Sequence, residues 1–226
     1  MNEQHSDENP KTVQSETPVL LVGGGFPDPL DIVNFVAKAP FVTAADGGAD
    51  FCLQNGVTPD VVIGDLDSLS DEAHAALAPE TLIKYIDQNL TDFEKCLTLI
   101  TAPYILATGF TAGRLDHLLA VFAVMARRIG PPVLLVGSDD VAFAASESLC
   151  LDLPPGVRLS IFPLVPTKGT SEGLLWPIDD LTIDPKGRLG TSNETVGPVK
   201  LTFDKPGAII LVPREHLTAV EAAMTG

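Results

Sequence analysis

The amino-acid sequence predicts an α/β fold in two parts: a mostly parallel sheet sandwiched by helices, Rossmann-like in type, followed by a smaller antiparallel β-sandwich domain. Up to about residue 140, short apolar runs alternate with segments of helical periodicity, as in parallel sheets whose strands are buried on both faces. After residue 145, short strand-like runs are separated by turns rich in Gly and Pro. That second pattern is typical of small antiparallel sandwiches and barrels.

These patterns set the expected domain limits. We expect a disordered tail over residues 1–17, an α/β domain over 18–140 and a β-sandwich domain over 141–226. The tail is polar and acidic, and such a composition offers too little apolar surface to form a packed element.

The elements of the first part follow one another closely. The expected strands are 19–22, 41–45, 61–64, 82–86, 104–107 and 133–136. The expected helices are 29–39, 49–54, 71–77, 91–101 and 114–129. The last helix is the clearest, because its apolar residues follow the 3.6-residue period; they are Leu115, Leu118, Leu119, Phe122 and Met125. Thr91 and Glu94 have the spacing of a capping box at the start of helix 91–101.

The second part is expected to contain strands with one closing helix. The strands are 148–151, 157–162, 173–176, 181–183, 199–203 and 208–212, and the helix is 214–224.

Charge and cysteine content exclude several classes of function. The net charge is −16 and the pI is about 4.4, which disfavours binding to nucleic acid or to anionic membranes. An anionic ligand would need a divalent cation beside it. Cys52, Cys96 and Cys150 form no CxxC pair, and we find no secretory segment or membrane-spanning run. We therefore expect a cytoplasmic protein.

Four carboxylates predict a metal site. Asp46 and the pair Asp65 and Asp67 come at the ends of predicted parallel strands, whose carboxyl ends share one rim. Asp92 falls in the first turn of a helix. One such residue alone is better interpreted as a turn or cap residue, but the four together favour a hard cation such as Mg²⁺.

Other polar clusters suit an anion. The small-residue turn 109–113 precedes a helix N-terminus, where free amides attract phosphate, and Arg114 adds a bidentate donor. Asp116 could position Arg114, bind a nucleotide hydroxyl or bind the metal, whereas His117 could be only a structural histidine. The turn Gly23-Gly24-Gly25 could approach a phosphate or be a plain loop.

Residues 88–92 open a helix, and Lys95 lies one turn into it. The Lys95 ammonium could contact a phosphate, or pair with Glu94 or Asp92 in solvent.

Several segments, taken in order, resemble the thiamin pyrophosphokinase family. They are DGGAD at 46–50, GDLDS at 64–68, QNLTDFEK at 88–95 and GRLDH at 113–117. In the second part, GLLWP at 173–177 and TSNE at 191–194 are similar to motifs of that family's thiamin-binding domain. The resemblance covers about residues 19–213. Two departures are Ala112, where the family usually has glycine, and Asn89, where an acidic residue is common.

The resemblance implies a homodimer with shared active sites that transfers the pyrophosphoryl group of ATP to the hydroxyl of thiamin, with Mg²⁺, giving thiamin diphosphate and AMP. Residues 18–140 would form the catalytic, ATP- and Mg-binding domain and residues 141–226 the thiamin-binding domain. The implied catalytic residues are Asp46, Asp65, Asp67, Asp92 and Arg114, with the metal held by Asp65, Asp67 and Asp92. The implied ATP-binding residues are Gln88, Thr91, Gly113, Arg114, Asp116 and His117. The implied thiamin contacts, delivered across the dimer, are Trp176, Ser192 and Asn193.

Three alternatives stay open at this point: a pyrophosphokinase for another alcohol such as a hydroxymethylpterin, a non-catalytic module that binds nucleotide or thiamin, and a metal-dependent phosphohydrolase. Trp176 could stack on thiamin or fill a sandwich core. No general base is evident; Asp46 is a candidate.

Overall fold

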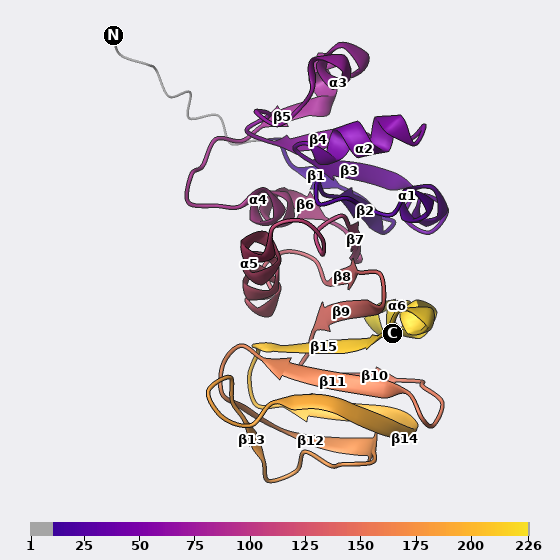
Figure 1. Ribbon diagram of the computed structural model, residues 1–226, viewed down its shortest axis with the longest axis vertical. Coiled ribbons are helices and arrows are strands. Elements are labelled where there is room, and N and C mark those ends of the chain that lie inside the picture. Colours follow the sequence, from indigo (N-terminus) through magenta and orange to yellow (C-terminus); the bar gives the residue numbers. More distant parts are fainter. Residues whose placement is uncertain (1–10, 226) are drawn as a thin grey trace.

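The computed structural model describes residues 11–225, and its first part is built on six parallel strands (Figure 1). Their order across the sheet is β8-β7-β2-β3-β4-β5, and each neighbouring pair is parallel. The bounds are β2 Val19–Val22, β3 Phe41–Ala45, β4 Val61–Gly64, β5 Leu82–Lys84, β7 Ile105–Thr108 and β8 Val133–Val136. All six expected strands are present, with differences of one or two residues at some ends.

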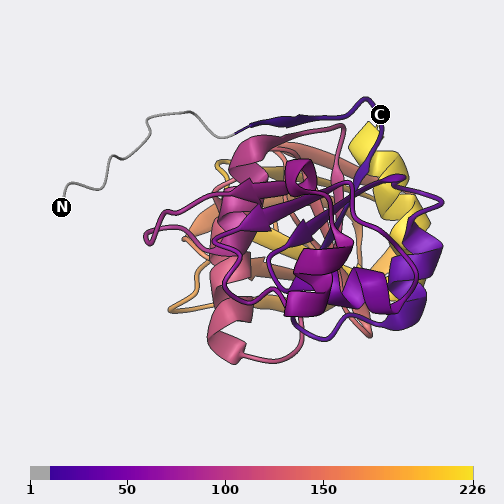
Figure 2. The same cartoon turned by 90° about the horizontal axis from the view of Figure 1, so that it is seen from above.

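Helices cover both faces of this parallel part (Figures 1 and 2). The bounds are α1 Pro29–Phe35, α2 Gly48–Gln54, α3 Asp71–Ala76, α4 Asp92–Leu99 and α5 Leu115–Ala126. Successive residues of β2 alternate between two buried clusters: Leu20 and Val22 pack with α1, α2 and α3, whereas Val19 and Leu21 pack with α4 and α5. Because a strand directs alternate side chains to opposite faces, an apolar strand such as β2 must be covered on both sides.

The second part continues the same sheet with antiparallel strands. β9 Asp140–Ala144 pairs with β8 and with β15 Ala208–Pro213, which pairs with β11 Arg158–Pro163. The remaining strands are β10 Ser148–Leu151, β12 Thr167–Leu174, β13 Thr182–Ile183 and β14 Gly190–Phe203. The long strand β14 pairs with β11 near its start and with β10 and β12 near its end. The β-rich part is therefore hydrogen-bonded to the parallel part, and the expected limit at 140/141 falls at the start of β9.

Two short strands correct the expectations at the edges. β1 Val13–Gln14 pairs in parallel with β6 Ile100–Thr101, so the prediction of a disordered tail was wrong for residues 13 and 14. Val13 is buried beside Ile100, a long-range contact that local composition does not reveal. Residues 1–10 of the predicted tail lie outside the described residues. The expected helix 91–101 ends at Leu99 because the next two residues form β6.

Helix α5 differs from the expectation in the face that it buries. Leu115 and Leu119 are 69% and 61% exposed, although both belong to the predicted apolar stripe. Met125 of that stripe is buried, together with Val121, Val124 and Ala126, and Leu118 and Phe122 are partly buried against the core. The helix therefore packs mainly through its C-terminal half.

The C-terminal segment ties the two parts together. Arg214, in the 3₁₀ turn Arg214–His216 before α6 Leu217–Thr225, forms an ion pair with Asp31 of α1. Its Nη1 donates to Asp31 Oδ2 at 2.9 Å and to the carbonyl oxygen of Gly137 at 3.0 Å. Asp31 is only 3% exposed, so its carboxylate depends on Arg214 for its charge partner. Within residues 11–225, no helix combines the length and the apolar character needed to cross a bilayer.

This ion pair gives a prediction about stability. Arg214→Met should lower the free energy of unfolding by about 3 kcal/mol, because it leaves a buried carboxylate without its partner. The matched control is Arg158→Met, which removes the more exposed pair with Asp140 and should cost less than about 1 kcal/mol. Urea unfolding followed by circular dichroism measures both, and equal losses would contradict the role given to Arg214.

Candidate active site

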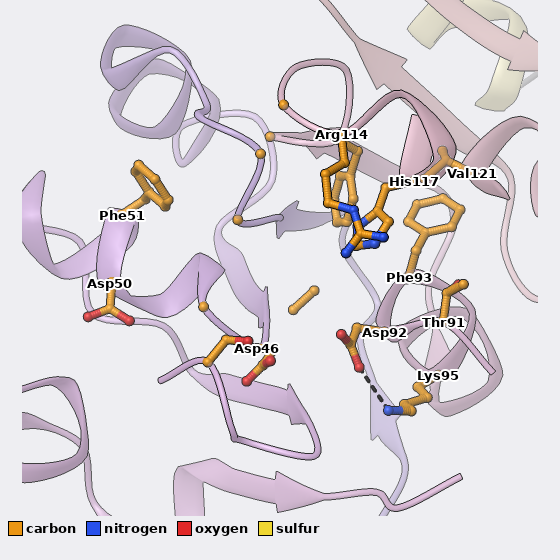
Figure 3. Close-up of a pocket in the computed structure, with 18 of the residues that line it drawn as sticks. Asp46, Asp50, Phe51, Thr91, Asp92, Phe93, Lys95, Arg114, His117 and Val121 are labelled. Atoms are coloured by element: carbon orange, nitrogen blue, oxygen red, sulfur yellow. Dashed lines mark hydrogen bonds and ion pairs between the residues drawn. The ribbon is translucent and has the colours of Figure 1, made fainter. Parts of the chain in front are cut away.

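A cleft of about 860 Å³ opens at the carboxyl ends of the parallel strands (Figure 3). Its walls come from the loops after β2, β3, β4 and β7 and from the N-terminal ends of α4 and α5. β3 pairs with one edge of β2, and β7, which comes later in the chain, pairs with the other edge of β2. Such a switch point is where open α/β sheets bind ligands.

Three carboxylates gather at one side of this cleft, and two of them, Asp46 and Asp65, line it. Asp46, Asp65 and Asp67 each place one oxygen so that the three atoms lie within 4.8 Å of one another. Asp46 is 4% exposed, and its Oδ1 atom is buried without a hydrogen-bond partner. Glycine at position 64 allows the Asp46 side chain to lie against it, because a Cβ atom at residue 64 would lie only 2.9 Å from the Asp46 Cβ.

The cluster suits a hard cation. Burial raises the pKa of Asp46, the Ser68 hydroxyl lowers it, and the negative charges of Asp92, Asp65 and Asp67 raise it further. A divalent cation would relieve both the repulsion and the unpartnered oxygen. Because all the donors are carboxylate oxygens, the residues present fit Mg²⁺.

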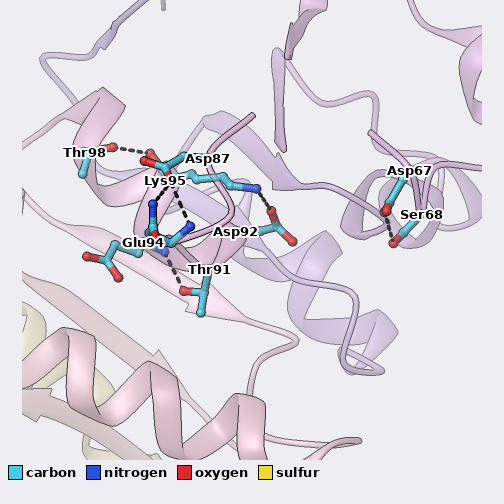
Figure 4. A network of polar contacts seen from close by, with 9 residues as sticks. Asp67, Ser68, Asp87, Thr91, Asp92, Glu94, Lys95 and Thr98 are labelled. Carbon is cyan, nitrogen blue, oxygen red and sulfur yellow. Dashed lines mark hydrogen bonds and ion pairs between the residues drawn. The ribbon is translucent and has the colours of Figure 1, made fainter. Parts of the chain in front are cut away.

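Asp92 lies across the cleft from Asp46 and faces it (Figure 3). It accepts a hydrogen bond from Lys95 Nζ at 2.8 Å (Figure 4). The expected metal set of Asp65, Asp67 and Asp92 is therefore brought together only in part, since Asp46 is the third member of the close cluster. Asp92 is near enough for its charge to raise the pKa of Asp46.

Lys95 is a cleft residue whose setting the sequence did not reveal. The expected pair with Asp92 is present. The prediction that the pair lies in solvent was wrong for Lys95, which is only 3% exposed. Burial lowers the pKa of Lys95, but the hydrogen bond and charge of Asp92, with Asp65 and Asp46, outweigh burial and leave it raised. The ammonium therefore stays charged against the acidic cluster. The signal in the sequence is its spacing of three residues from Asp92, in a helix that also carries Glu94 and Thr98.

The N-terminal ends of two helices face the same space. Thr91 caps α4, accepting from the Glu94 amide at 3.2 Å as the capping spacing predicts. Thr91 and Gln88 line the cleft. At the other helix, α5, Arg114 and His117 project over the opening (Figure 3).

Arg114 is held by its neighbour. Its Nε and Nη2 atoms donate to the two oxygens of Asp116 at 3.1 and 2.6 Å, and this contact lowers the pKa of the Asp116 carboxyl. Of the three roles considered for Asp116, the geometry supports positioning Arg114, and Asp116 does not line the cleft. In the same turn, Gly113 has a φ of +84° whereas Ala112 does not have a positive φ, so the methyl of Ala112 causes no backbone strain.

Aromatic side chains at the mouth of the cleft were also missed. Phe26 and Phe51 line it and meet edge to face, with ring centroids 6.0 Å apart. Phe26 is 72% exposed and has a φ of 52°, a conformation uncommon for a non-glycine residue. Their wide separation in the sequence gives no local sign of this contact.

The three expected thiamin contacts do not reach this cleft within one chain. They lie on or next to β12 and β14, at the opposite end of the molecule from β4 and α4 (Figure 1). Trp176 is 56% exposed, so it is not a sandwich core residue. Asn193 is buried, and its amide bonds the backbone of Trp176 in both directions, at 2.7 and 3.2 Å. Ser192 is exposed beside it.

Comparison with known proteins gives one consistent answer. Residues 32–132 match the model of the thiamin pyrophosphokinase catalytic domain, and residues 151–207 match the model of the thiamin pyrophosphokinase vitamin B1 binding domain. Thiamine pyrophosphokinase 1 of Oryza sativa subsp. japonica is 27% identical over 154 residues, which are 60% of this chain and 58% of the rice protein. Thiamine pyrophosphokinase 1 of Arabidopsis thaliana is 25% identical over 200 residues, 74% of each chain.

Solved structures share the fold. Thiamin pyrophosphokinase from Candida albicans superposes with a TM-score of 0.71 at 17% identity, covering 90% of this chain and 92% of that one. The protein from Geobacillus thermodenitrificans gives 0.71 at 23% identity, covering 87% and 97%. Two models of one family match successive parts of this chain, and together the matched parts make up more than half of its residues. The chain therefore belongs to the thiamin pyrophosphokinase family.

Proposed function

We propose that the protein transfers the pyrophosphoryl group of ATP to the hydroxyl of thiamin, yielding thiamin diphosphate and AMP. The observation that carries this proposal is one cleft in which the Asp46, Asp65 and Asp67 cluster faces Arg114 and the N-terminus of α5, in a chain of this family. Carboxylates that fit a cation and donors that fit phosphate are the two halves of a phosphoryl-transfer site.

In this proposal Asp46, Asp65 and Asp67 would hold Mg²⁺, and Asp92 faces Asp46 from α4. The ion would supply charge neutralisation at the phosphate oxygens. We assign Asp46 to the metal rather than to general-base catalysis, because its buried unpartnered oxygen needs a cation. Lys95 keeps Asp92 aimed into the cleft.

The reaction forms one bond and breaks one. The thiamin hydroxyl oxygen attacks the β-phosphorus of ATP, the bond from that phosphorus to the oxygen shared with the α-phosphorus breaks, and AMP leaves with the bridging oxygen. The hydroxyl proton passes to water. Arg114, held in place by Asp116, and the amides at Gly113 would stabilise the phosphate charge, while Gln88, Thr91 and His117 would line the ATP site.

The residues that bind the acceptor, thiamin, are expected to come from a second chain. Trp176 and Ser192 would contact thiamin, and Asn193 would hold the Trp176 backbone rather than the ligand. Because these residues lie at the far end of the same chain, a homodimer with shared sites would complete the cleft. Residues 18–140 would then be the ATP- and Mg-binding domain and 141–226 the thiamin-binding domain, acting in the cytoplasm.

The direct test is incubation of the purified protein with Mg-ATP, with and without thiamin, followed by separation of the nucleotides and thiamin esters. Thiamin-dependent AMP together with thiamin diphosphate supports the proposal. AMP formed only with a hydroxymethylpterin would identify a different acceptor. Ligand binding without AMP would indicate a sensing module, and phosphate released without an acceptor would indicate a hydrolase.

The metal site gives a second prediction. Asp65→Asn should lower kcat by about 100-fold or more, because it removes one charge from the cluster that meets the phosphates. The exposed Asp71→Asn, at the start of α3 and outside the cleft, is the matched control and should keep wild-type activity. Thermal unfolding checks that both variants fold; near-normal turnover by Asp65→Asn would remove that residue from the mechanism.

The shared site gives a third prediction. Asp65→Asn and Trp176→Ala subunits should each be inactive alone, yet a refolded equimolar mixture should regain about a quarter of wild-type activity. Half of the dimers are then mixed, and each mixed dimer contains one intact site built from both chains. A mixture as inactive as its components would place the whole site within one chain.

A further inference from the structure

The loop that carries two of the three clustered carboxylates joins β4 to α3 and spans residues 65–70. Within it, Leu66 has a φ of 66°, a conformation that is uncommon for a residue other than glycine. Asp65 and Asp67 stand on either side of Leu66, so this turn sets the direction of both carboxylates. Strained backbone of this kind persists only where the surrounding structure holds it in place.

The core holds the loop through two apolar side chains. Leu66 is partly buried against the cluster beneath α1, α2 and α3, and Leu69 is a buried member of that cluster. Apolar contacts have no preferred direction, so these two do not by themselves fix how far the loop lies from Asp46. The carboxylate cluster depends on that spacing, because Asp46 belongs to a different loop.

Asp50 supplies a directed contact between the two loops. It lies in the first turn of α2, on the same side of the cleft as Asp46 and opposite Asp92 (Figure 3). Its Oδ2 atom accepts from the amide of Ser70 at 3.2 Å, and its Oδ1 atom accepts from the Ser70 hydroxyl. Both carboxylate oxygens of Asp50 therefore bind the last residue of the loop.

This contact is separate from the capping of α3. The Ser70 hydroxyl oxygen accepts from the amide of Ala73 at 3.1 Å, and this bond alone makes Ser70 the N-cap. The bonds from Ser70 to Asp50 run back toward α2 instead. Asp50 is also not a member of the carboxylate cluster that fits a cation. Its contacts thus join two loops, and they add nothing to the cap.

The two loops touch beside the carboxylates. A Cβ atom at Gly47 would lie 3.2 Å from the carbonyl oxygen of Ser68. The hydroxyl of the same serine donates to Asp67 Oδ1 at 3.0 Å (Figure 4). A movement of residues 65–70 away from α2 would therefore separate the three oxygens of the cluster, which now lie within 4.8 Å of one another.

We propose that Asp50 is a positioning residue for the metal site. By binding Ser70, it keeps Asp65 and Asp67 at the distance from Asp46 at which all three carboxylates contact one cation. This inference rests on the proposed function in taking the cluster as a Mg²⁺ site. It adds a residue that acts on the cation through its hydrogen bonds and not through its charge.

The test measures the binding of Mn²⁺ alone, as a paramagnetic substitute for Mg²⁺, by electron paramagnetic resonance without nucleotide or thiamin. Asp50→Ala should weaken Mn²⁺ binding about tenfold, the usual effect of losing a group that orients metal ligands. Asp50→Asn removes the charge but keeps both contacts, because its oxygen can accept from the Ser70 amide and its nitrogen can donate to the Ser70 hydroxyl oxygen. Its Mn²⁺ affinity should stay close to that of the wild type.

Asp60→Ala is the matched control. Asp60 Oδ2 accepts from the amide of Val42 at 2.8 Å, so this carboxylate also ties β3 to the segment before β4, at the end of the strands away from the cleft. Both alanine variants should lower the temperature of thermal unfolding, because each loses hydrogen bonds. Only Asp50→Ala should lose Mn²⁺ affinity.

Mn²⁺ binding by Asp50→Ala at the wild-type affinity would overturn the inference and leave the proposed metal site intact. An equal loss in Asp50→Asn and Asp50→Ala would also overturn it, since the charge would then be what matters. Ser70→Ala tests the same contact if Asp50→Ala does not fold: it keeps the charge, loses the hydroxyl, and should weaken Mn²⁺ binding more than Asp50→Asn does. A wild-type protein that binds no Mn²⁺ would contradict the metal site and this inference together.

Discussion

The cleft is organised around one buried carboxylate with an unpartnered oxygen. An unsatisfied buried polar atom costs about 1–3 kcal/mol, and Asp46 Oδ1 is such an atom. The fold tolerates it because the backbone around Asp46 is well held: its amide donates to the carbonyl oxygen of Ile63 at 3.0 Å, and its own carbonyl accepts from Ala49 at 3.1 Å. The destabilising oxygen is thereby kept aimed at the space where a cation would stabilise it.

The other parts of the cleft follow from the same constraint. Carboxylates gathered this closely repel one another, and within residues 11–225 Lys95 is the buried ammonium that pairs with the acidic group nearest to them. The acidic groups keep the Lys95 ammonium charged, and the hydrogen bond from Lys95 holds the Asp92 carboxylate in position. Arg114 pairs with Asp116 on the far side of the opening, so the guanidinium is held apart from the acidic cluster.

Local features of the sequence predicted much of this arrangement, and long-range contacts account for what it missed. The strands that carry Asp46 and Asp65 were predictable because each is an apolar run bounded by turn residues, and the cap at Thr91 needs only residues within one turn. Other features depend on residues far away in the chain. They are the burial of Lys95, the short strand at Val13, and the pairing of β14 with β11 near its start and with β10 and β12 near its end. Periodicity also could not show that the sheet continues from β8 into β9, because nothing local distinguishes a strand that joins two domains from one that ends a domain.

Helix α5 shows why periodicity gives the existence of an apolar face but not what covers it. Its stripe of Leu115, Leu118, Leu119, Phe122 and Met125 has the pattern of a core face, yet only Met125 of these residues is fully buried. Leu118 and Phe122 are partly buried against the core and also line a cavity, and Leu115 and Leu119 remain exposed. An apolar surface kept at the opening of a polar cleft costs solubility and adds little to folding. Its presence there is best explained by what binds at that opening, since a ligand or a second chain would remove from water the area that the core leaves uncovered.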